Sequence, residues 1–192
     1  APLEVKDHEY KAVLSVFQMN LKLKELRKKW ESEGDKWPDL VKNMQHRIGI
    51  NTGNLVTGNM GSELQMNYTC MGDSVNLGAR LESGAKHWGI DVQVSDSVYE
   101  ATKDYFIYRK LGSIRVKGKE EPVKVYELIC QKGEESEDIK NLLNQFELAR
   151  KLYLNKKWDK AIEAFNKCSK LEDISFLRKT NPSQTYIKIC NE

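Results

Sequence analysis

The 192-residue sequence contains no apolar run that approaches the roughly 20 residues needed to span a bilayer. We therefore expect no membrane contact from this chain. Residues 1–7 show neither a basic nor an apolar segment, so no secretory signal peptide is predicted. The four cysteines form no C-x-x-C pair, which indicates reduced thiols and a cytoplasmic protein rather than a disulfide framework or a zinc site.

An excess of charge of one sign is also missing. The formal net charge is only +3, from 31 basic and 28 acidic residues, so no nucleic-acid partner is expected. Neither common phosphate-binding motif, G-x-x-x-x-G-K-[ST] or G-x-G-x-x-G, occurs. With 40% hydrophobic and 31% charged residues, the composition is that of a globular domain whose chemistry must lie in less general motifs.

The N-terminal two thirds of the chain mixes helix and strand patterns. Apolar residues at helical spacing predict a helix over residues 7–30, and its basic cluster at 22–29 suits either the helix dipole or a binding patch. A loop or short broken helix is expected at 31–43. Strands at 48–50 and 55–58 flank a turn, which predicts a β-hairpin between them. The remaining expected elements are strands at 68–71, 90–94, 106–111, 114–116 and 123–129, and helices at 74–83 (with Asp73 as N-cap) and 95–104.

The C-terminal part reads as purely helical. Residues 132–140 form a charged linker, and residues 141–192 carry two amphipathic stripes separated by a turn at 155–157, then a loop and a last short helix. The small and large residues of the two stripes resemble one tetratricopeptide repeat, although Asp173 stands where that repeat has proline. A single repeat cannot bury its own apolar face, so we expect it to pack against the preceding domain or another chain.

One segment stands out for its chemistry. The run YTCMGDSVNLGARLE at 68–82 predicts a strand, a glycine turn and the start of a helix. Asn76 and Arg80 are four residues apart and therefore lie on one face of that helix. A carboxamide and a guanidinium there could hold a ribose and a phosphate oxygen, while a capped surface helix with an ordinary arginine is the alternative on spacing alone.

Three motifs together resemble a known family. RIGINTG at 47–53, the run at 68–82 and VKGK at 116–119 closely resemble successive motifs of class III nucleotidyl (adenylate/guanylate) cyclase catalytic domains, over residues 1–129. The resemblance implies an α+β, ferredoxin-like domain (residues 1–131) that lacks its N-terminal strands, followed by the linker at 132–140 and the helical extension at 141–192. It further implies a homodimer, or a complementing cyclase half, in which each partner supplies part of a site.

The resemblance also assigns roles to individual residues. In such enzymes the ribose 3′-hydroxyl attacks the α-phosphorus of the nucleotide and pyrophosphate leaves. Asn76 would orient the ribose, and Arg80 would stabilise charge developing on the α-phosphate. Lys117 would hold the terminal phosphates, with Lys119 as the alternative. Thr69 falls where the family reads the purine and favours ATP, with guanylate cyclase as the alternative.

The chain departs from the family in one important respect. The two aspartates that bind Mg²⁺ or Mn²⁺ in the family, and a lysine that reads adenine, lie upstream of the first helix and are absent here. Ala1-Pro2 resembles the turn after the second aspartate. We therefore expect the chain alone to be inactive and its parent, which could be anchored upstream, to make cyclic AMP. The alternatives are a nucleotide-binding pseudo-cyclase and an interaction module that docks a partner through its helical hairpin.

Overall fold

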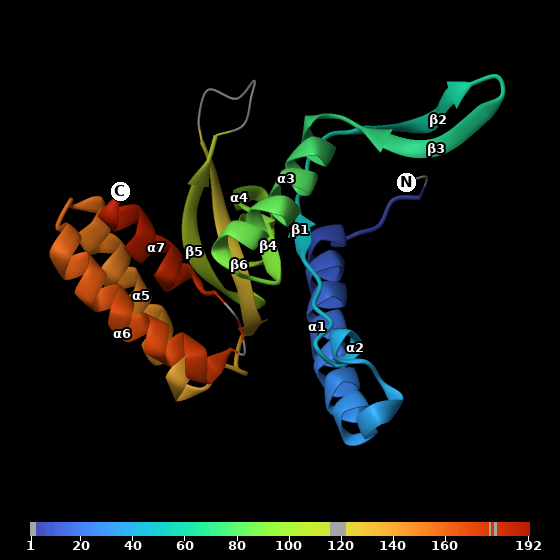
Figure 1. Ribbon diagram of the computed structural model, residues 1–192. Coiled ribbons are helices and arrows are strands. Elements are labelled where there is room, and N and C mark those ends of the chain that lie inside the picture. The colour runs from blue at the N-terminus through green and yellow to red at the C-terminus, as the bar shows by residue number, and fades with distance from the viewer. Residues whose placement is uncertain (1–2, 116–121, 177, 179) are drawn as a thin grey trace.

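The computed structural model describes residues 3–115, 122–176, 178 and 180–192 (Figure 1). The chain opens with the long helix α1, which confirms the helix predicted over 7–30, and continues through two short helical turns. In order, the elements are α1 (His8–Ser32), η1 (Gly34–Lys36), α2 (Asp39–Lys42), β1 (Ile48–Ile50), β2 (Val56–Ser62), β3 (Gln65–Met71), α3 (Asp73–Trp88), β4 (Val92–Ser95), α4 (Asp96–Thr102), β5 (Phe106–Ile114), β6 (Val123–Gln131), α5 (Glu137–Leu154), α6 (Trp158–Ser175) and α7 (Pro182–Asn191).

The main sheet has four strands in the order β1-β4-β6-β5. β1 and β4 are parallel, whereas β6 is antiparallel to both of its neighbours. Helices α1 and α4 cover one face, and α3 together with α5–α7 covers the other (Figure 1). This arrangement confirms the α+β class.

Alternation along β6 shows why the sheet is buried on both faces. Tyr126 and Leu128 pack in the cluster under α1, whereas Val125 packs in the cluster under α3. Because successive side chains of a strand point to opposite faces, β6 contributes to both cores. α1 closes its side with Val13 and Phe17.

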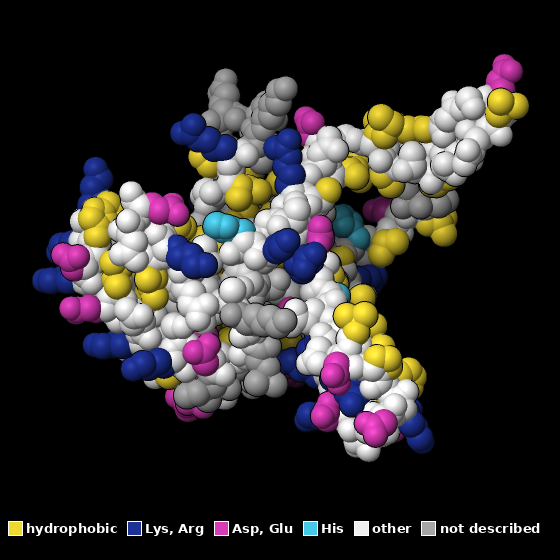
Figure 2. Space-filling view, in the orientation of Figure 1, with side chains coloured by type: hydrophobic (Ala, Val, Ile, Leu, Met, Phe, Trp, Pro, Cys, Tyr) yellow, Lys and Arg dark blue, Asp and Glu magenta, His cyan; other side chains and the backbone are white. Residues whose placement is uncertain are grey.

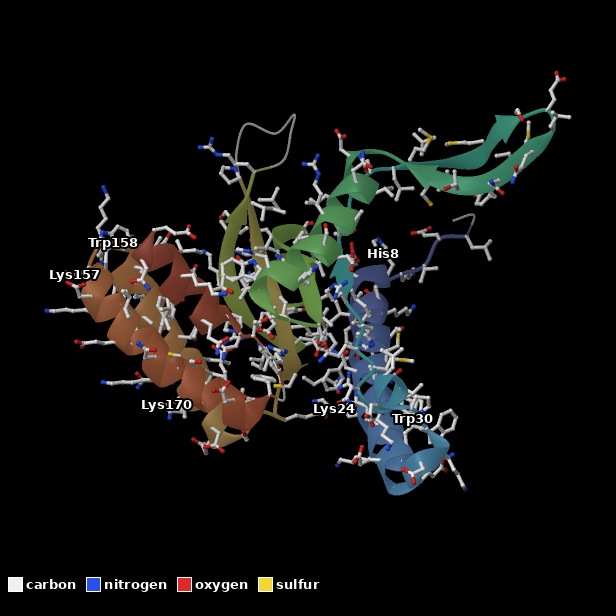
Figure 3. All side chains as sticks on the ribbon, viewed as in Figure 1. His8, Lys24, Trp30, Lys157, Trp158 and Lys170 are labelled. Carbon is white, nitrogen blue, oxygen red and sulfur yellow. The ribbon has the colours of Figure 1, made fainter. Side chains whose placement is uncertain are left out.

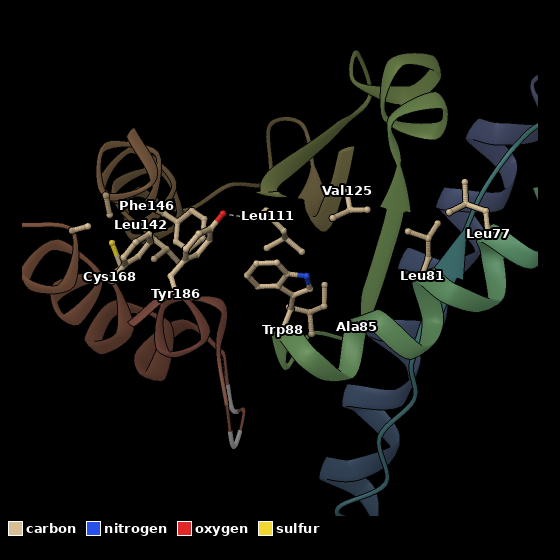
Figure 4. Packing of buried hydrophobic residues seen from close by; sticks show 14 residues of the cluster. Leu77, Leu81, Ala85, Trp88, Leu111, Val125, Leu142, Phe146, Cys168 and Tyr186 are labelled. Carbon is tan, nitrogen blue, oxygen red and sulfur yellow. Dashed lines mark hydrogen bonds between the residues drawn. The ribbon is translucent and has the colours of Figure 1, made fainter. Parts of the chain in front are cut away.

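The second core joins the sheet to the C-terminal helices. Trp88 at the end of α3 packs beside Tyr186 of α7, whose ring stacks on Phe165 of α6 with centroids 4.7 Å apart (Figure 4). Leu111 of β5 and Phe146 of α5 belong to the same cluster. The C-terminal helices and the sheet therefore share one core, as expected if the extension packs against the preceding domain.

The β2–β3 hairpin was not predicted in this form. We expected residues 48–50 to pair with 55–58, but β1 pairs with β4, and β2 pairs with β3 from Val56↔Met71 to Ser62↔Gln65. Residues 59–62 and Gln65 therefore belong to strands, although no strand was predicted over them. Ile48 and Ile50 of β1 pack against the core on the α1 side of the main sheet, whereas the β2–β3 hairpin projects away from the sheet (Figure 1).

Three smaller expectations also need correction. Two strands were predicted at 106–111 and 114–116, but residues 106–114 form one strand, β5. Its pairing with β6 shifts register between Lys110 and Gly112, and Gly112 has φ of 154°. Helix α3 continues to Trp88 rather than stopping near Ser83, and Gly72 rather than Asp73 is its N-cap. Apolar contacts with distant elements extend both β5 and α3 beyond their local patterns.

The C-terminal helices form a bundle at one end of the molecule. α5 begins at Glu137, where the side chain of Ser136 accepts a hydrogen bond from the Ile139 amide, and α6 returns antiparallel to it (Figure 1). Trp158 and Lys170 mark this bundle in Figure 3, while Lys24 and Trp30 mark α1 on the opposite side. The likeness of this hairpin to a tetratricopeptide repeat stays a prediction.

Among the described residues, no helix combines the length and the apolar character that crossing a membrane demands.

Candidate active site

The candidate site is built around the N-terminal half of α3. Gly72 ends β3 with φ of 142°, a conformation that L residues rarely adopt, and its carbonyl accepts hydrogen bonds from the amides of Val75 and Asn76 at 3.1 Å each. The strand, glycine turn and helix predicted from 68–82 are thereby confirmed.

Asn76 and Arg80 project from this half of α3, and both are exposed. Residues four apart lie one above the other on a helix, so the two side chains share a face. Within the described part of the chain, neither side chain forms a hydrogen bond or an ion pair. Both groups are therefore available to a ligand.

Close packing against β1 fixes where α3 lies. A methyl group on Gly49 of β1 would lie 2.3 Å from the Gly78 carbonyl oxygen and 2.4 Å from the Glu82 amide nitrogen. No side chain fits between strand and helix at this point. The two backbones therefore meet directly, on the side of α3 that faces away from Arg80.

The loop after β1 holds the first turn of α3. The side-chain Nδ2 of Asn51 donates to the Ser74 carbonyl at 2.9 Å. The Ser97 hydroxyl of α4 donates to the side-chain Oδ1 of Asn51 at 3.4 Å. A methyl group on Gly53 would meet the Ser74 hydroxyl at 2.5 Å. The motif at 47–53 therefore acts by positioning α3, a role that the sequence analysis did not assign to these residues.

The structure brings only part of the predicted site together. Thr69 lies on β3 opposite Gly58 and is exposed, near the base of the hairpin that leads into α3. Among the described residues no hydrogen bond joins it to Asn76 or Arg80. Lys117 and its alternative Lys119 lie outside the described residues.

The described residues do not fit a metal site. Over residues 3–115, 122–176, 178 and 180–192, no cluster of three or more His, Cys, Asp or Glu side chains is arranged to hold an ion. Glu82, which is close to the site along α3, instead pairs with Arg47 at 3.3 Å.

A family model described as the adenylate and guanylate cyclase catalytic domain matches residues 2–130. The chain belongs to this family. It is 31% identical over 147 residues to the terminal-differentiation-specific adenylate cyclase of Dictyostelium discoideum, covering 74% of this chain but 7% of that protein. It is 39% identical over 83 residues to adenylate cyclase 1 of Rhizobium meliloti, covering 43% of this chain and 12% of that protein.

A guanylyl cyclase is also among the relatives. The membrane guanylyl cyclase of Dictyostelium discoideum is 36% identical over 77 residues, covering 40% of this chain and 5% of that protein. The chain thus spans only a small part of each of these curated relatives. Sequence likeness places it in the cyclase family without separating the adenylate from the guanylate type.

Solved structures agree on the fold. The guanylyl cyclase Cya2 superposes with a TM-score of 0.55 at 28% identity, covering 70% of this chain and 64% of that one. A bacterial light-regulated adenylyl cyclase gives a TM-score of 0.54 at 26% identity, covering 73% and 39%. The fold is therefore similar to that of solved cyclases of both types.

Proposed function

We propose that this chain supplies the nucleotide-holding side of an adenylate cyclase site, which converts ATP into 3′,5′-cyclic AMP and pyrophosphate for intracellular signalling. The observation that carries the proposal is the pair Asn76 and Arg80, which are exposed, have no partner among the described residues and lie on a helix that backbone packing holds in place. Thr69 on β3, the residue expected to read the purine, favours ATP over GTP.

The proposed chemistry uses three features of this chain. The Asn76 carboxamide binds the ribose and directs its 3′-hydroxyl toward the α-phosphorus. Arg80, a rigid and permanently charged donor, stabilises the negative charge that grows on the α-phosphate oxygens as pyrophosphate leaves. Because close packing holds α3, both donors are in place before the reaction and little reorganisation is needed.

Mg²⁺ or Mn²⁺ remains part of the proposal, with ligands outside the described residues. The chain would then work with a complementing half or a second copy. The β2–β3 hairpin supports pairing, since it exposes Val56 (66%), Met66 (61%) and Tyr68 (60%) on an arm that extends from the body (Figure 2). Apolar side chains on a projecting surface are typical of an association site. We further propose that the pairing takes place in the cytoplasm.

Nucleotide binding by the unaltered chain is the first test. Calorimetric titration should detect ATP, and GTP more weakly, while Arg80→Ala should weaken ATP binding at least about tenfold through loss of charged hydrogen bonds. Lys86→Ala is the control, because Lys86 is also exposed on α3 but lies in its last turn. Equal binding by both variants would contradict the assignment of Arg80.

A pseudo-cyclase that binds ATP without turning it over is the second candidate. It would use the same Asn76 and Arg80 to bind ATP and would differ from the first candidate only in turnover. Joining an upstream cyclase segment with two aspartates, then assaying cyclic AMP with Mg²⁺ or Mn²⁺, separates the two. Bound ATP without product in the completed protein would favour the pseudo-cyclase.

A further inference from the structure

The C-terminal helix α7 touches the far end of the helix that carries Asn76 and Arg80. The Thr185 hydroxyl of α7 donates to the His87 carbonyl in the last turn of α3 at 3.0 Å. Next to it the Trp88 ring lies against Tyr186, with centroids 5.4 Å apart (Figure 4). α7 therefore satisfies a terminal carbonyl of α3 and packs on its last aromatic residue.

The segment before α7 fits closely against the end of α3. Gly89 closes α3 with φ of 68°, and a methyl group there would meet the Thr180 hydroxyl at 2.3 Å and the Thr180 carbonyl oxygen at 2.4 Å. Only glycine allows both the backbone conformation and this contact. We call Thr180, Thr185 and Tyr186 the α7 clamp.

A buried network of charges fixes the clamp to the sheet. On the face of the sheet under α3, Arg109 of β5 donates from Nε to Glu127 of β6 at 2.8 Å and pairs through Nη1 with Glu172 of α6 at 3.0 Å. Arg178, which precedes α7, pairs with the second oxygen of Glu127 at 2.5 Å. Arg109, Glu127 and Glu172 are buried and Arg178 is 12% exposed, so the two arginines and two glutamates compensate one another with little access to water.

This network continues directly into α7. The Ser183 hydroxyl donates to the Glu172 carboxylate at 2.5 Å, and the Tyr186 hydroxyl donates to the Leu111 carbonyl of β5 at 2.5 Å. Helix α7 is therefore fixed both to α6 and to the sheet. It cannot move relative to the sheet without breaking buried polar contacts, which are costly to leave unmade.

We infer that the α7 clamp orients the active-site helix: Thr180 and Thr185 are positioning residues that act on Asn76 and Arg80 through α3. The inference rests on the proposed function of those two residues. The middle of α3 touches β1 where Gly49 meets Gly78 and Glu82, and Asn51 holds its first turn. The clamp adds a restraint at the last turn, so that both ends of the helix are held. The C-terminal extension is thereby a part of the site and a route by which a signal acting on the extension can reach it.

The test compares two glycines that have nearly the same backbone angle. Gly89 has φ of 68° and meets Thr180, whereas Gly34 has φ of 62° and no neighbour within 4 Å of an added methyl group. Gly89→Ala and Gly34→Ala therefore introduce similar backbone strain, and only the first presses on the clamp. Thr185→Val is the milder variant, because it removes the hydroxyl and keeps the shape.

Two measurements are made on the 192-residue chain. Both use conditions in which urea denaturation shows that each variant is fully folded. We expect Gly89→Ala and Thr185→Val to weaken ATP binding about three- to tenfold and Gly34→Ala to leave it unchanged. We also expect faster amide hydrogen exchange at residues 75–82 in the first two variants only. A role limited to packing would lower stability without changing the ATP affinity of the folded molecules.

The outcomes separate this inference from the proposed function. If ATP affinity and exchange at 75–82 are the same in Gly89→Ala, Thr185→Val and Gly34→Ala, while Arg80→Ala still loses ATP, the clamp is overturned and the proposed function stands. If the unaltered chain binds no ATP, the proposed function fails. The exchange comparison needs no nucleotide, so equal exchange would then overturn the clamp as well.

Discussion

Gly49 determines how closely α3 approaches the sheet. Since an added methyl group would fall 2.3 to 2.4 Å from backbone atoms of Gly78 and Glu82, Gly49→Ala can be accommodated only by moving the helix. Overpacking usually costs about 1–3 kcal/mol, and backbone neighbours put this case at the upper end. We expect Gly49→Ala to lower the free energy of unfolding by about 3 kcal/mol, measured by urea denaturation.

A second strand glycine supplies the control. Gly58 lies on β2, and an added methyl group there would find nothing within 4 Å. Gly58→Ala should therefore change the free energy of unfolding by less than about 0.5 kcal/mol. Similar losses in both variants would show that strand geometry, not contact with α3, explains the effect.

Glu127 makes stability depend on pH. Burial alone would raise the pKa of this carboxyl, but the guanidinium groups of Arg109 and Arg178 outweigh burial and hold the pKa below its ordinary value of 4.5. A lowered pKa in the folded state gives stability that is present above pH 4.5 and lost as the pH falls through the lowered value. Glu127→Gln should lower the free energy of unfolding by about 3–5 kcal/mol at pH 7 and abolish its decrease at acid pH. Urea denaturation at a series of pH values from 3 to 7 measures both effects.

The pKa of Glu172, in the same network, is shifted in the opposite direction from that of Glu127. Burial raises the pKa of Glu172 above 4.5 despite its contacts with Arg109 and Ser183. Its contribution is complete below pH 4.5 and is lost as the pH rises through the raised value. Because the folded state disfavours the ionised form of Glu172 and favours that of Glu127, Glu172→Gln should cost less than Glu127→Gln at pH 7. The opposite ranking would contradict these charge assignments.

The sequence motifs identified Asn76 and Arg80 but not the residues that hold α3 in place. The pair could be found because its spacing falls within one helix and its motif resembles a family. Gly49 and Glu127 act through partners that lie far away in the sequence, and neither residue type reveals such a partner. A charged residue at a buried position of β6 is the one signal available, and it becomes visible only when the strand's faces are known.

Among the elements, the β2–β3 hairpin is the one most exposed. Tyr68 is 60% exposed on β3, and we expect the double variant Met66→Lys/Tyr68→Lys to reduce self-association of the chain by removing apolar contact area. Sedimentation velocity over a range of protein concentrations measures this. Fold stability should be little affected, because both side chains lie outside the two buried cores.

Met19 of α1 is the control for this prediction, since it is 52% exposed on a different element. Met19→Lys adds a positive charge but leaves the hairpin intact, so association should stay as in the unaltered chain. An equal effect of Met19→Lys would mean that charge, not the hairpin surface, governs association.

Element boundaries and element pairing differ in how far the sequence predicts them. Helical periodicity gave α1 nearly to the residue, since its pattern is contained in the helix itself. The partner of β1 could not be read in this way, because a turn at 52–54 suits a hairpin as well as it suits a crossing to another strand. β1 pairs with β4 because this pairing lets Ile48 and Ile50 pack against the core on the α1 side of the sheet.

The molecule as a whole has a core that is continuous from α3 through the sheet to α7. Phe146 of α5 is 1% exposed and lies under the Arg109 guanidinium at 4.7 Å. Phe146→Ala should lower the free energy of unfolding by about 3–5 kcal/mol, because it leaves a large cavity in that core. Amide exchange should then increase in β5 as well as in α5 and α6.

Leu148, on the same helix but 54% exposed, is the control, and Leu148→Ala should have little effect. If Phe146→Ala increases exchange in α5 and α6 while β5 stays protected, the extension unfolds on its own. Such a result would mean that the shared core does not make the extension and the sheet one cooperative unit.

The projecting hairpin has a consequence for any quantity measured in solution. If its apolar surface brings two chains together to complete a site, mass action governs the amount of completed site. Activity per chain would then fall on dilution and rise with expression level in the cell. Abundance of the protein would itself become a regulatory input, without any change in the residues that bind nucleotide.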